Sequence, residues 1–449
     1  FDVLRALARI RHRGPDGSGV AIDARGAVHG HVRLAVVDPS PASSQPFRRG
    51  DGVLSYVGEI WNYRSLRDDL KIIGEAFTTT GDVEVVAAAL SRWGAAALPR
   101  FRGMFAFAWT SPREAFIARD RFGEVPIYYV RGPGWTVWGS ERRALGDLGG
   151  AALALGPGCL LDLNSGGESR TWYVLRPVAA ERVDDEAVER MIFRGVQERL
   201  LTADVPVCVL LSGGVDSALV AAMGRRVNPG LVAYVCAVKG ADDANDVAAA
   251  TRAADVIGIE LRTVRIAMPS PLDLARAVDA IEVSFQASVE IAALCLPLAE
   301  RIRRDGFRVV LGGEGADELF GGYGNMMRRA TSDDEWRGTR LAYWTKQARG
   351  NFVRLNKAFM AHGVEARLPY CDRELVETVL GLGLVGCPPG KALLRRVAGK
   401  WLPADVAARP KVTFQRGAGL AAKLDAKGRV RVGDYNAAAR ESFGVVPRG

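Results

Sequence analysis

Hydrophobic and polar residues alternate in short runs along the first third of the chain, and this period of two predicts β-strands. Two segments, at 63–70 and 83–93, interrupt the alternation, and the second has apolar residues at helical spacing. Short strands with a few amphipathic helices predict an antiparallel α+β fold of layered sheets. The strands are expected at residues 27–34, 52–57, 105–109, 115–118, 127–130 and 135–138.

The pattern changes after a polar, charged stretch at residues 170–187, which we interpret as a domain boundary. Strands and helices then alternate, which predicts a doubly wound parallel α/β sheet, followed from residue 343 by a mostly helical part. The expected domains are residues 1–175 and 186–449. The expected strands are 205–211, 231–238, 261–266 and 308–311, and the expected helices are 187–201, one starting at 217, 246–257 and 289–303.

Composition places the 449 residues among ordinary globular proteins, with 48% hydrophobic and 25% charged residues. The net charge of +9 is spread without a block of like charges, so we expect no nucleic-acid partner. No stretch reaches 18 uncharged apolar residues, so we expect no membrane span. Six widely spaced cysteines without CxxC pairs favour a reducing cytoplasm, and four histidines without metal-ligand spacing argue against a zinc site.

The clearest chemical motif joins a buried strand to a helix. It reads Ser212-Gly213-Gly214-Val215-Asp216-Ser217. Glycines at such a turn let backbone N–H groups and the helix N-terminus approach an anion, and serine hydroxyls can donate to phosphate oxygens. Asp216 would repel phosphate unless a divalent cation bridges them, which implies Mg²⁺. The loop is not a Walker A motif, because no lysine follows the glycines.

A second glycine-rich motif follows the predicted strand at 308–311. It contains Glu314, Asp317 and Glu318 within residues 312–323. Loops after parallel strands gather at one edge of the sheet, so this turn is expected to face the first motif, with Asp317 and Asp216 sharing a metal on a pyrophosphate group. Positive charge for the leaving phosphates or an oxyanion is available at residues 354–357 and 409–414, where Lys411 is a candidate.

Taken together, the motifs resemble the asparagine synthetase B family, whose relatives include β-lactam synthetases and lasso-peptide cyclases. The resemblance implies a class II glutamine amidotransferase domain of the Ntn type, followed by a synthetase domain of the ATP-pyrophosphatase type. In that family ATP adenylates a carboxylate, pyrophosphate leaves, and an amine displaces AMP. The motifs occur in family order at residues 11–16, 33–34, 58–60, 80–82, 102–107, 118–121, 212–217, 313–323, 365–370 and 391–395.

The resemblance also implies roles for single residues, with ATP and Mg²⁺ as cofactors. Ser212, Gly213, Gly214, Asp216 and Ser217 match the pyrophosphate loop, and Asp216 with Asp317 the metal ligands. Leu210, Val238 and Gly313 match positions that line adenine and ribose. Glu314 and Lys411 match catalytic positions near the acyl group and the adenylate. Arg33, Gly58, Glu59 and Asp82 match positions that hold glutamine, where an arginine suits its carboxylate.

Three departures from the family pattern bear on the activity. The family's glutaminase nucleophile is an N-terminal Cys, but none of the six cysteines lies near the start and the chain opens beyond the strand that would carry it. Either that segment is missing from this sequence or the protein lacks it. Val57 replaces the Asn that donates to the oxyanion, and losing such a donor typically lowers kcat by about 10²–10³. Gln286 lies in the acyl-substrate loop, where aspartate-using members carry Thr and Arg, and it cannot supply that positive charge.

We therefore expect an amide synthetase for a dedicated biosynthetic carboxylate, small or peptidic, with impaired glutaminase and ammonia or a substrate amine as nucleophile. The alternative is a glutamine-hydrolysing asparagine synthetase acting on aspartate. A third hypothesis, a non-catalytic scaffold, is disfavoured by the intact phosphate loop and both carboxylates. A homodimer of this protein would also be consistent with the family.

Overall fold

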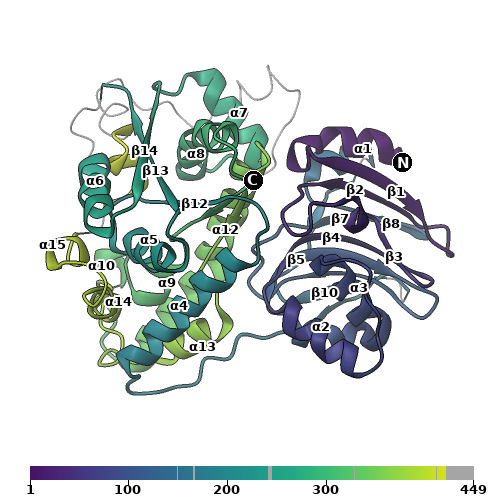
Figure 1. Ribbon diagram of the computed structural model, residues 1–449, viewed down its shortest axis with the longest axis horizontal. Helices are drawn as coiled ribbons and strands as arrows, with labels where there is room; N and C mark the ends of the chain where they lie inside the picture. The colour runs from purple at the N-terminus through teal and green to yellow at the C-terminus, as the bar shows by residue number, and fades with distance from the viewer. Residues whose placement is uncertain (149, 165–166, 241–244, 328, 411, 421–449) are drawn as a thin grey trace. The chain divides into compact units, whose positions relative to one another are not determined.

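The computed structural model describes residues 1–148, 150–164, 167–240, 245–327, 329–410 and 412–420. They divide into two compact units (Figure 1). The N-terminal unit comprises Phe1–Leu175 and Thr202–Val205, and the C-terminal unit comprises Arg176–Leu201 and the chain from Pro206 onward. The excursion at Thr202–Val205 joins the first unit because the backbone N–H of Asp38 donates to Asp204 Oδ2 at 2.8 Å.

The N-terminal unit is built mainly from antiparallel strands. Its helices are α1 (Val3–Arg9), α2 (Tyr63–Ile72) and α3 (Asp82–Trp93). Its strands are β1 (Gly17–Ile22), β2 (Val28–Arg33), β3 (Phe47–Arg49), β4 (Gly52–Ile60), β5 (Gly103–Thr110), β6 (Ala115–Arg119), β7 (Tyr128–Gly132), β8 (Trp135–Gly139), β9 (Leu153–Ala154), β10 (Cys159–Asp162) and β11 (Ser169–Thr171).

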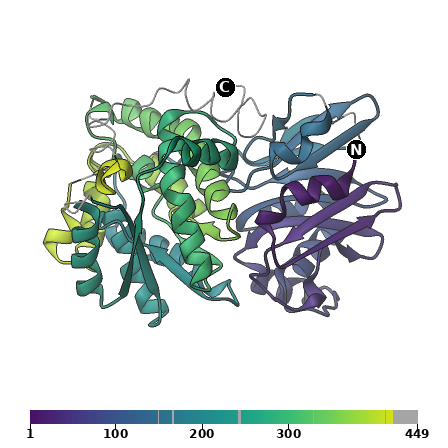
Figure 2. The same ribbon diagram turned by 90° about the horizontal axis from the view of Figure 1, so that it is seen from above.

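Among the described residues these strands form a six-stranded sheet in the order β11-β10-β6-β5-β4-β3, a hairpin β1-β2 and a three-stranded sheet β8-β7-β9. Helix α3 packs on β3 and β4, and α1 lies across the β1–β2 hairpin (Figures 1 and 2). Apolar residues that alternate along β5 and β6 place Met104, Ala106 and Ile117 in the core together with Ile127, which precedes β7. The predicted antiparallel α+β fold is confirmed.

The C-terminal unit alternates strands with helices. Its strands are β12 (Val207–Leu210), β13 (Val232–Val238), β14 (Glu260–Ile266), β15 (Val309–Leu311) and β16 (Glu365–Arg367). Its helices are α4 (Asp185–Leu201), α5 (Val215–Val227), α6 (Asn245–Ile257), α7 (Pro271–Ile281), α8 (Gln286–Arg304), α9 (Ala316–Phe320), α10 (Gly324–Met327), α11 (Asp333–Tyr343), α12 (Arg349–Met360), α13 (Arg373–Gly381), α14 (Ala392–Ala398), α15 (Ala404–Ala407) and α16 (Phe414–Gly417).

The strands of this unit form a parallel sheet in the order β14-β13-β12-β15-β16 within the described part of the chain. Every residue of β13 is buried, as expected for a strand with helices on both faces. Helices α5, α6 and α14 lie on one face of the sheet, and α7, α8 and α12 on the other (Figure 1). The predicted doubly wound sheet is confirmed.

Two elements of this unit go beyond the sequence prediction. Strand β16 has three residues inside the region expected to be mostly helical, and it is buried because it pairs with β15. Helix α7 begins with a capping box, in which Ser270 and Asp273 satisfy each other's backbone N–H groups, and with Pro271 at its first turn. No single helix in the described residues is long and apolar enough to cross a membrane, and α7 with α8 passes that test only as a pair bent by 99°.

Candidate active site

Two loops of the C-terminal unit meet where the order of the parallel strands reverses. We call residues 212–217 the Ser212 loop and residues 312–323 the Gly312 loop. They follow β12 and β15, which are paired neighbours, and ligands of doubly wound sheets bind at this switch point. A Cβ added at Gly313 would lie 3.2 Å from both the backbone nitrogen of Ser217 and the Cβ of Asp216. The two sequence motifs therefore form one site.

Hydrogen bonds within the Ser212 loop hold its shape. The Ser217 hydroxyl accepts from the N–H of Ser212 at 3.1 Å and donates to the Gly214 carbonyl at 3.2 Å. Gly213 has φ +72°, and a Cβ there would lie 2.6 Å from the backbone of Ala249 in α6. Gly214 is the N-cap of α5 and offers no side-chain cap, so the first-turn N–H groups are suited to a phosphate.

Asp216 and Asp317 each lie in the first turn of a helix, and a lysine lies between them. Lys391 Nζ is 2.5 Å from Asp216 Oδ2 and 2.6 Å from Asp317 Oδ1. The lysine side chain is 3% exposed, and the two carboxylates are 14% and 15% exposed. Water screens these charges little, so their interaction is stronger than that of a surface ion pair.

The carboxylates fit Mg²⁺ that enters together with a nucleotide. Across the described residues, no group of three or more His, Cys, Asp or Glu side chains could hold a metal ion by itself. The buried Oδ1 of Asp216 has no hydrogen-bond partner and is available as a ligand. Mg²⁺ usually takes one or two carboxylates and completes its octahedron with water and substrate phosphates. Asp216 and Asp317 would supply that share of the ligands.

Two further side chains fasten the Ser212 loop. The Tyr370 hydroxyl donates to the Asp216 carbonyl at 3.0 Å, and burial raises the pKa of Tyr370 well above its usual value. Arg409 donates to the Ser212 carbonyl at 3.0 Å and pairs with Asp246 of α6 at 3.0 Å. Both side chains therefore bind backbone carbonyls of the Ser212 loop.

Glu314 folds back over the start of the Gly312 loop. A Cβ added at Gly312 would lie 2.6 Å from Glu314 Oε2. Burial raises the pKa of Cys295 in α8 to about 12. The positive charge of Arg354 opposes this increase, and the negative charge of Glu314 adds to it. These two charges of opposite sign therefore lie near the same buried thiol, on the face of the sheet that carries α8 and α12.

Residues of α12 join a partly buried polar network with Glu318 and Tyr323. The Tyr323 hydroxyl donates to Glu318 Oε1 at 2.6 Å, and Asn351 donates to the same oxygen at 3.2 Å. Arg354 donates to Asn351 Oδ1 at 2.8 Å. Burial and the Glu318 charge raise the pKa of Tyr323, so this hydroxyl remains protonated.

The basic cluster predicted at residues 354–357 is directed into the protein. Lys357 Nζ lies 2.5 Å from Glu282 Oε2, with the side chains 1% and 9% exposed. Asn356 is also buried. Lys357 is thus neutralised by a carboxylate at the C-cap of α7.

The residues matched to adenine and ribose lie at strand ends. Leu210 ends β12 and is half-buried, and Val238 ends β13 and is fully buried. The Val238 N–H donates to the Ala418 carbonyl at 2.9 Å, so the segment at 412–420 covers this edge of the sheet. Lys411 lies outside the described residues.

Gln286 begins α8, and its side-chain amide donates to Glu290 Oε1 at 2.9 Å. Because α8 leads back into parallel strand β15, its N-terminus lies at the carboxyl edge of the sheet, the edge that carries both loops. Phe285, immediately before the helix, is 69% exposed. Residues 283–290 contain no Lys or Arg, so this edge offers an amide, a carboxylate and an aromatic ring.

The residues matched to glutamine binding lie in the N-terminal unit. Arg33 donates to the carbonyls of Ser40 at 2.7 Å and Asp38 at 2.5 Å. Burial lowers the Arg33 pKa, and the carboxylates of Asp38, Asp16 and Asp82 oppose that effect.

Asp82, Gly58 and Glu59 lie around strand β4. Asp82 accepts from the Tyr56 hydroxyl at 2.7 Å, and Glu59 is 4% exposed. Gly58 has φ +119°, and a Cβ there would lie 2.0 Å from the Met104 carbonyl oxygen, so only glycine fits. The residues matched to glutamine binding therefore lie at or next to strands β2 and β4.

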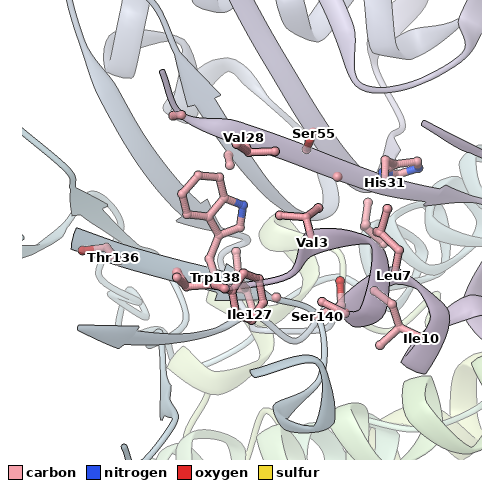
Figure 3. Close-up of a pocket in the computed structure, with 18 of the residues that line it drawn as sticks. Val3, Leu7, Ile10, Val28, His31, Ser55, Ile127, Thr136, Trp138 and Ser140 are labelled. Carbon is pink, nitrogen blue, oxygen red and sulfur yellow. The ribbon is translucent and has the colours of Figure 1, made fainter. Parts of the chain in front are cut away.

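An apolar cavity of about 400 Å³ lies in the same unit (Figure 3). Leu7 of α1, Val28 of β2, and Thr136 and Trp138 of β8 line it, and Val57 reaches it from β4. Strand β2 pairs with β1, and β8 pairs with β7.

Comparison with known families follows the same division of the chain. Residues 1–162 match the model described as a glutamine amidotransferase domain, and residues 187–349 and 332–441 match the model described as asparagine synthase. Layered antiparallel sheets, followed by a parallel sheet with a glycine-rich turn and paired carboxylates, together with these two matches, define an ATP-dependent amidotransferase-synthetase.

Relatives identify the family. The chain is 31% identical over 445 residues to asparagine synthetase B [glutamine-hydrolyzing] of Escherichia coli. The aligned region covers 92% of this chain and 78% of the relative. It is 30% identical over 400 residues to asparagine synthetase [glutamine-hydrolyzing] 3 of Arabidopsis thaliana, covering 85% and 68%. A solved glutamine phosphoribosylpyrophosphate amidotransferase from B. subtilis is 19% identical over 57% of this chain and 61% of its own, with a TM-score of 0.34. The chain belongs to the asparagine synthetase family and is a ligase that forms carbon–nitrogen bonds.

Sequence reasoning assigned no role to Lys391, Tyr370 or Arg409. Each belongs to a motif or cluster noted in the sequence, but each is 154–197 residues from its partner in the Ser212 loop. No local spacing links positions so far apart. The ordered motifs at 365–370 and 391–395 were the available signal.

Proposed function

We propose that this protein adenylates a dedicated biosynthetic carboxylate with ATP, releases pyrophosphate, and joins the acyl group to ammonia or a substrate amine with loss of AMP. The observation that carries the proposal is the meeting of the Ser212 and Gly312 loops at the switch point. There Asp216 and Asp317 both contact the ammonium group of Lys391. A structural turn needs no such pair of buried carboxylates.

Each residue of the site has a part in this chemistry. The N–H groups and hydroxyls of the Ser212 loop bind the leaving pyrophosphate, and Asp216 and Asp317 hold Mg²⁺. Mg²⁺, when bound, neutralises charge that develops on the phosphates. Glu314 orients the acyl or amine substrate, Leu210, Val238 and Gly313 bound the nucleoside, and Lys411 stabilises the adenylate.

The glutaminase is proposed to be impaired. The side chain of Val57 offers no hydrogen-bond donor to an oxyanion, although Arg33, Glu59 and Asp82 match positions that hold glutamine in the family. Binding of glutamine without an oxyanion donor would leave hydrolysis slow, because that donor acts on the transition state.

The carboxylate is proposed to differ from free aspartate. The start of α8 presents Gln286 bonded to Glu290, with exposed Phe285 beside them, and no cation within residues 283–290. A second carboxylate on the substrate would meet a negative charge there. A substrate with an amide, amine or apolar group suits this edge better.

The first test measures AMP and pyrophosphate release from ATP with aspartate, supplied with either glutamine or ammonia. We expect no asparagine in either case, and turnover only with a dedicated acid. Asparagine formed with glutamine would overturn both the substrate and the Val57 arguments and establish the alternative, a glutamine-hydrolysing asparagine synthetase. Asparagine formed only with ammonia would restore aspartate as substrate and support the impaired glutaminase.

The scaffold hypothesis has its own test. Asp216→Ala removes a carboxylate that a scaffold would not need. If the variant supports the pathway product as well as the wild type does, catalysis is not this protein's role.

A further inference from the structure

Lys391 is buried at the place that a cation would occupy between two carboxylates. Its Nζ is 2.5 Å from Asp216 and 2.6 Å from Asp317, and its side chain is 3% exposed. Carboxylates so close to a common point repel each other unless a positive charge lies between them. The protein supplies that charge from its own chain.

The backbone around Lys391 holds it in this position. Lys391 has φ +64°, the left-handed region that residues with a side chain seldom adopt. Its N–H donates to the Phe320 carbonyl at 3.0 Å, and the N–H of Gly390 donates to the Gly321 carbonyl at 2.9 Å. These bonds join the lysine's turn to the end of the Gly312 loop and maintain the strained conformation.

Gly322 gives the ion pair its space. A Cβ at this position would lie 2.0 Å from Asp317 Oδ1 and 2.3 Å from Lys391 Cε. The missing side chain at Gly322 thus leaves room for the contact between Asp317 and Lys391.

We infer that Lys391 is a placeholder cation, which neutralises Asp216 and Asp317 while nucleotide is absent and yields its position to Mg²⁺ that enters with the triphosphate. The inference rests on the proposed function, because that function brings ATP and Mg²⁺ to this site. The bare metal must compete with a covalently tethered ammonium, whereas metal carried by phosphate oxygens gains further ligands. The displaced ammonium then remains near the negative phosphates.

The consequence is that divalent metal and nucleotide bind together and not separately. We would titrate the full chain with Mn²⁺, which is visible by electron paramagnetic resonance, in the absence of nucleotide. Lys391→Met should bind Mn²⁺ at least about tenfold more tightly than the wild type, because the competing charge is gone. The double variant Asp216→Asn with Lys391→Met should lose this gain.

A second measurement needs no variant. A non-hydrolysable ATP analogue should raise the Mn²⁺ affinity of the wild type by about 100-fold, near the upper end of typical coupling between two ligands. Wild-type protein that binds Mn²⁺ equally well with and without the analogue would refute the placeholder role, as would a folded Lys391→Met variant with unchanged Mn²⁺ affinity. Pyrophosphate release is scored separately. Intact metal–nucleotide coupling without ligase activity would refute the proposed function alone.

Discussion

Gly322 shows how little space the site leaves at the scale of one residue. Replacing it with Ala forces a methyl group into the contact of Asp317 with Lys391, where the available distances are 2.0 and 2.3 Å. We expect Gly322→Ala to destabilise the protein by about 2 kcal/mol and to reduce pyrophosphate release at least about tenfold. Urea denaturation and a pyrophosphate assay measure the two effects.

Gly338 is the matched control for this change. It lies in α11, and a Cβ there meets nothing within 4 Å. Gly338→Ala should leave the activity unchanged and stabilise the helix slightly, because alanine favours helix more than glycine does. Equal loss of activity in both variants would show that the crowding at Gly322 is not the cause.

Asp216 carries the largest expected effect of any carboxylate in the C-terminal unit. Asp216→Asn keeps the size of the side chain but removes the charge that faces Lys391 and the metal. We expect pyrophosphate release to fall at least about 100-fold with an unchanged circular dichroism spectrum. Asp255→Asn on the exposed side of α6 is the control and should retain full activity.

At the scale of elements, Arg409 ties three segments together. It holds the carbonyl of Ser212 and the carboxylate of Asp246, and its own carbonyl accepts from Arg395 at 3.0 Å. Asp246 is 5% exposed, so removing Arg409 takes away an ion-pair partner of a buried carboxylate. The Ser212 loop, α6 and the segment after α15 are therefore expected to loosen together.

Arg409→Gln should lower the free energy of unfolding by about 3 kcal/mol and weaken ATP binding, because the Ser212 loop loses its tether. Arg252→Gln is the control, since the Arg252–Asp405 pair lies on the surface and surface pairs contribute little. Chemical denaturation and nucleotide titration would compare them. An Arg409 variant as stable as the control would contradict the tether.

At the scale of the whole molecule, buried histidines make the N-terminal unit sensitive to acid. Burial lowers the pKa of His29 to about 4 and that of His31 to about 3, from 6.5. His29 lies between the hydroxyls of Ser55 at 3.3 Å and Thr110 at 2.8 Å. Both imidazoles are therefore neutral in the folded unit at pH 7.

For each histidine the folded-state pKa lies below the unfolded value of 6.5. The unit therefore keeps its full stability above pH 6.5 and loses stability as the pH falls toward 4. Over that range each histidine lowers the free energy of unfolding by about 1.4 kcal/mol for every unit by which the pH falls. Hydrogen exchange of peptides that cover β2, compared at pH 7 and pH 5 after correction for intrinsic rates, measures the loss. His29→Gln should reduce the pH dependence, and a slope equal to that of the wild type would exclude His29 as its source.

The sequence by itself determined the two kinds of fold and the positions of the two loops. Alternation with period two and glycine-rich turns after apolar strands are local patterns, so they can be recognised without tertiary contacts. The family order of the motifs came from the same linear information. The sequence did not predict strand β16, because its three residues form a strand only through their pairing with β15.

Only the tertiary structure decided what surrounds the two aspartates. Lys391 is 175 residues from Asp216 in the chain, and Tyr370 is 154 residues from it. A single lysine or tyrosine so distant has no periodicity or spacing to reveal its partner. The strand order, the positive φ at Lys391 and the missing side chain at Gly322 bring the ammonium between the carboxylates, because packing joins segments that the sequence keeps apart.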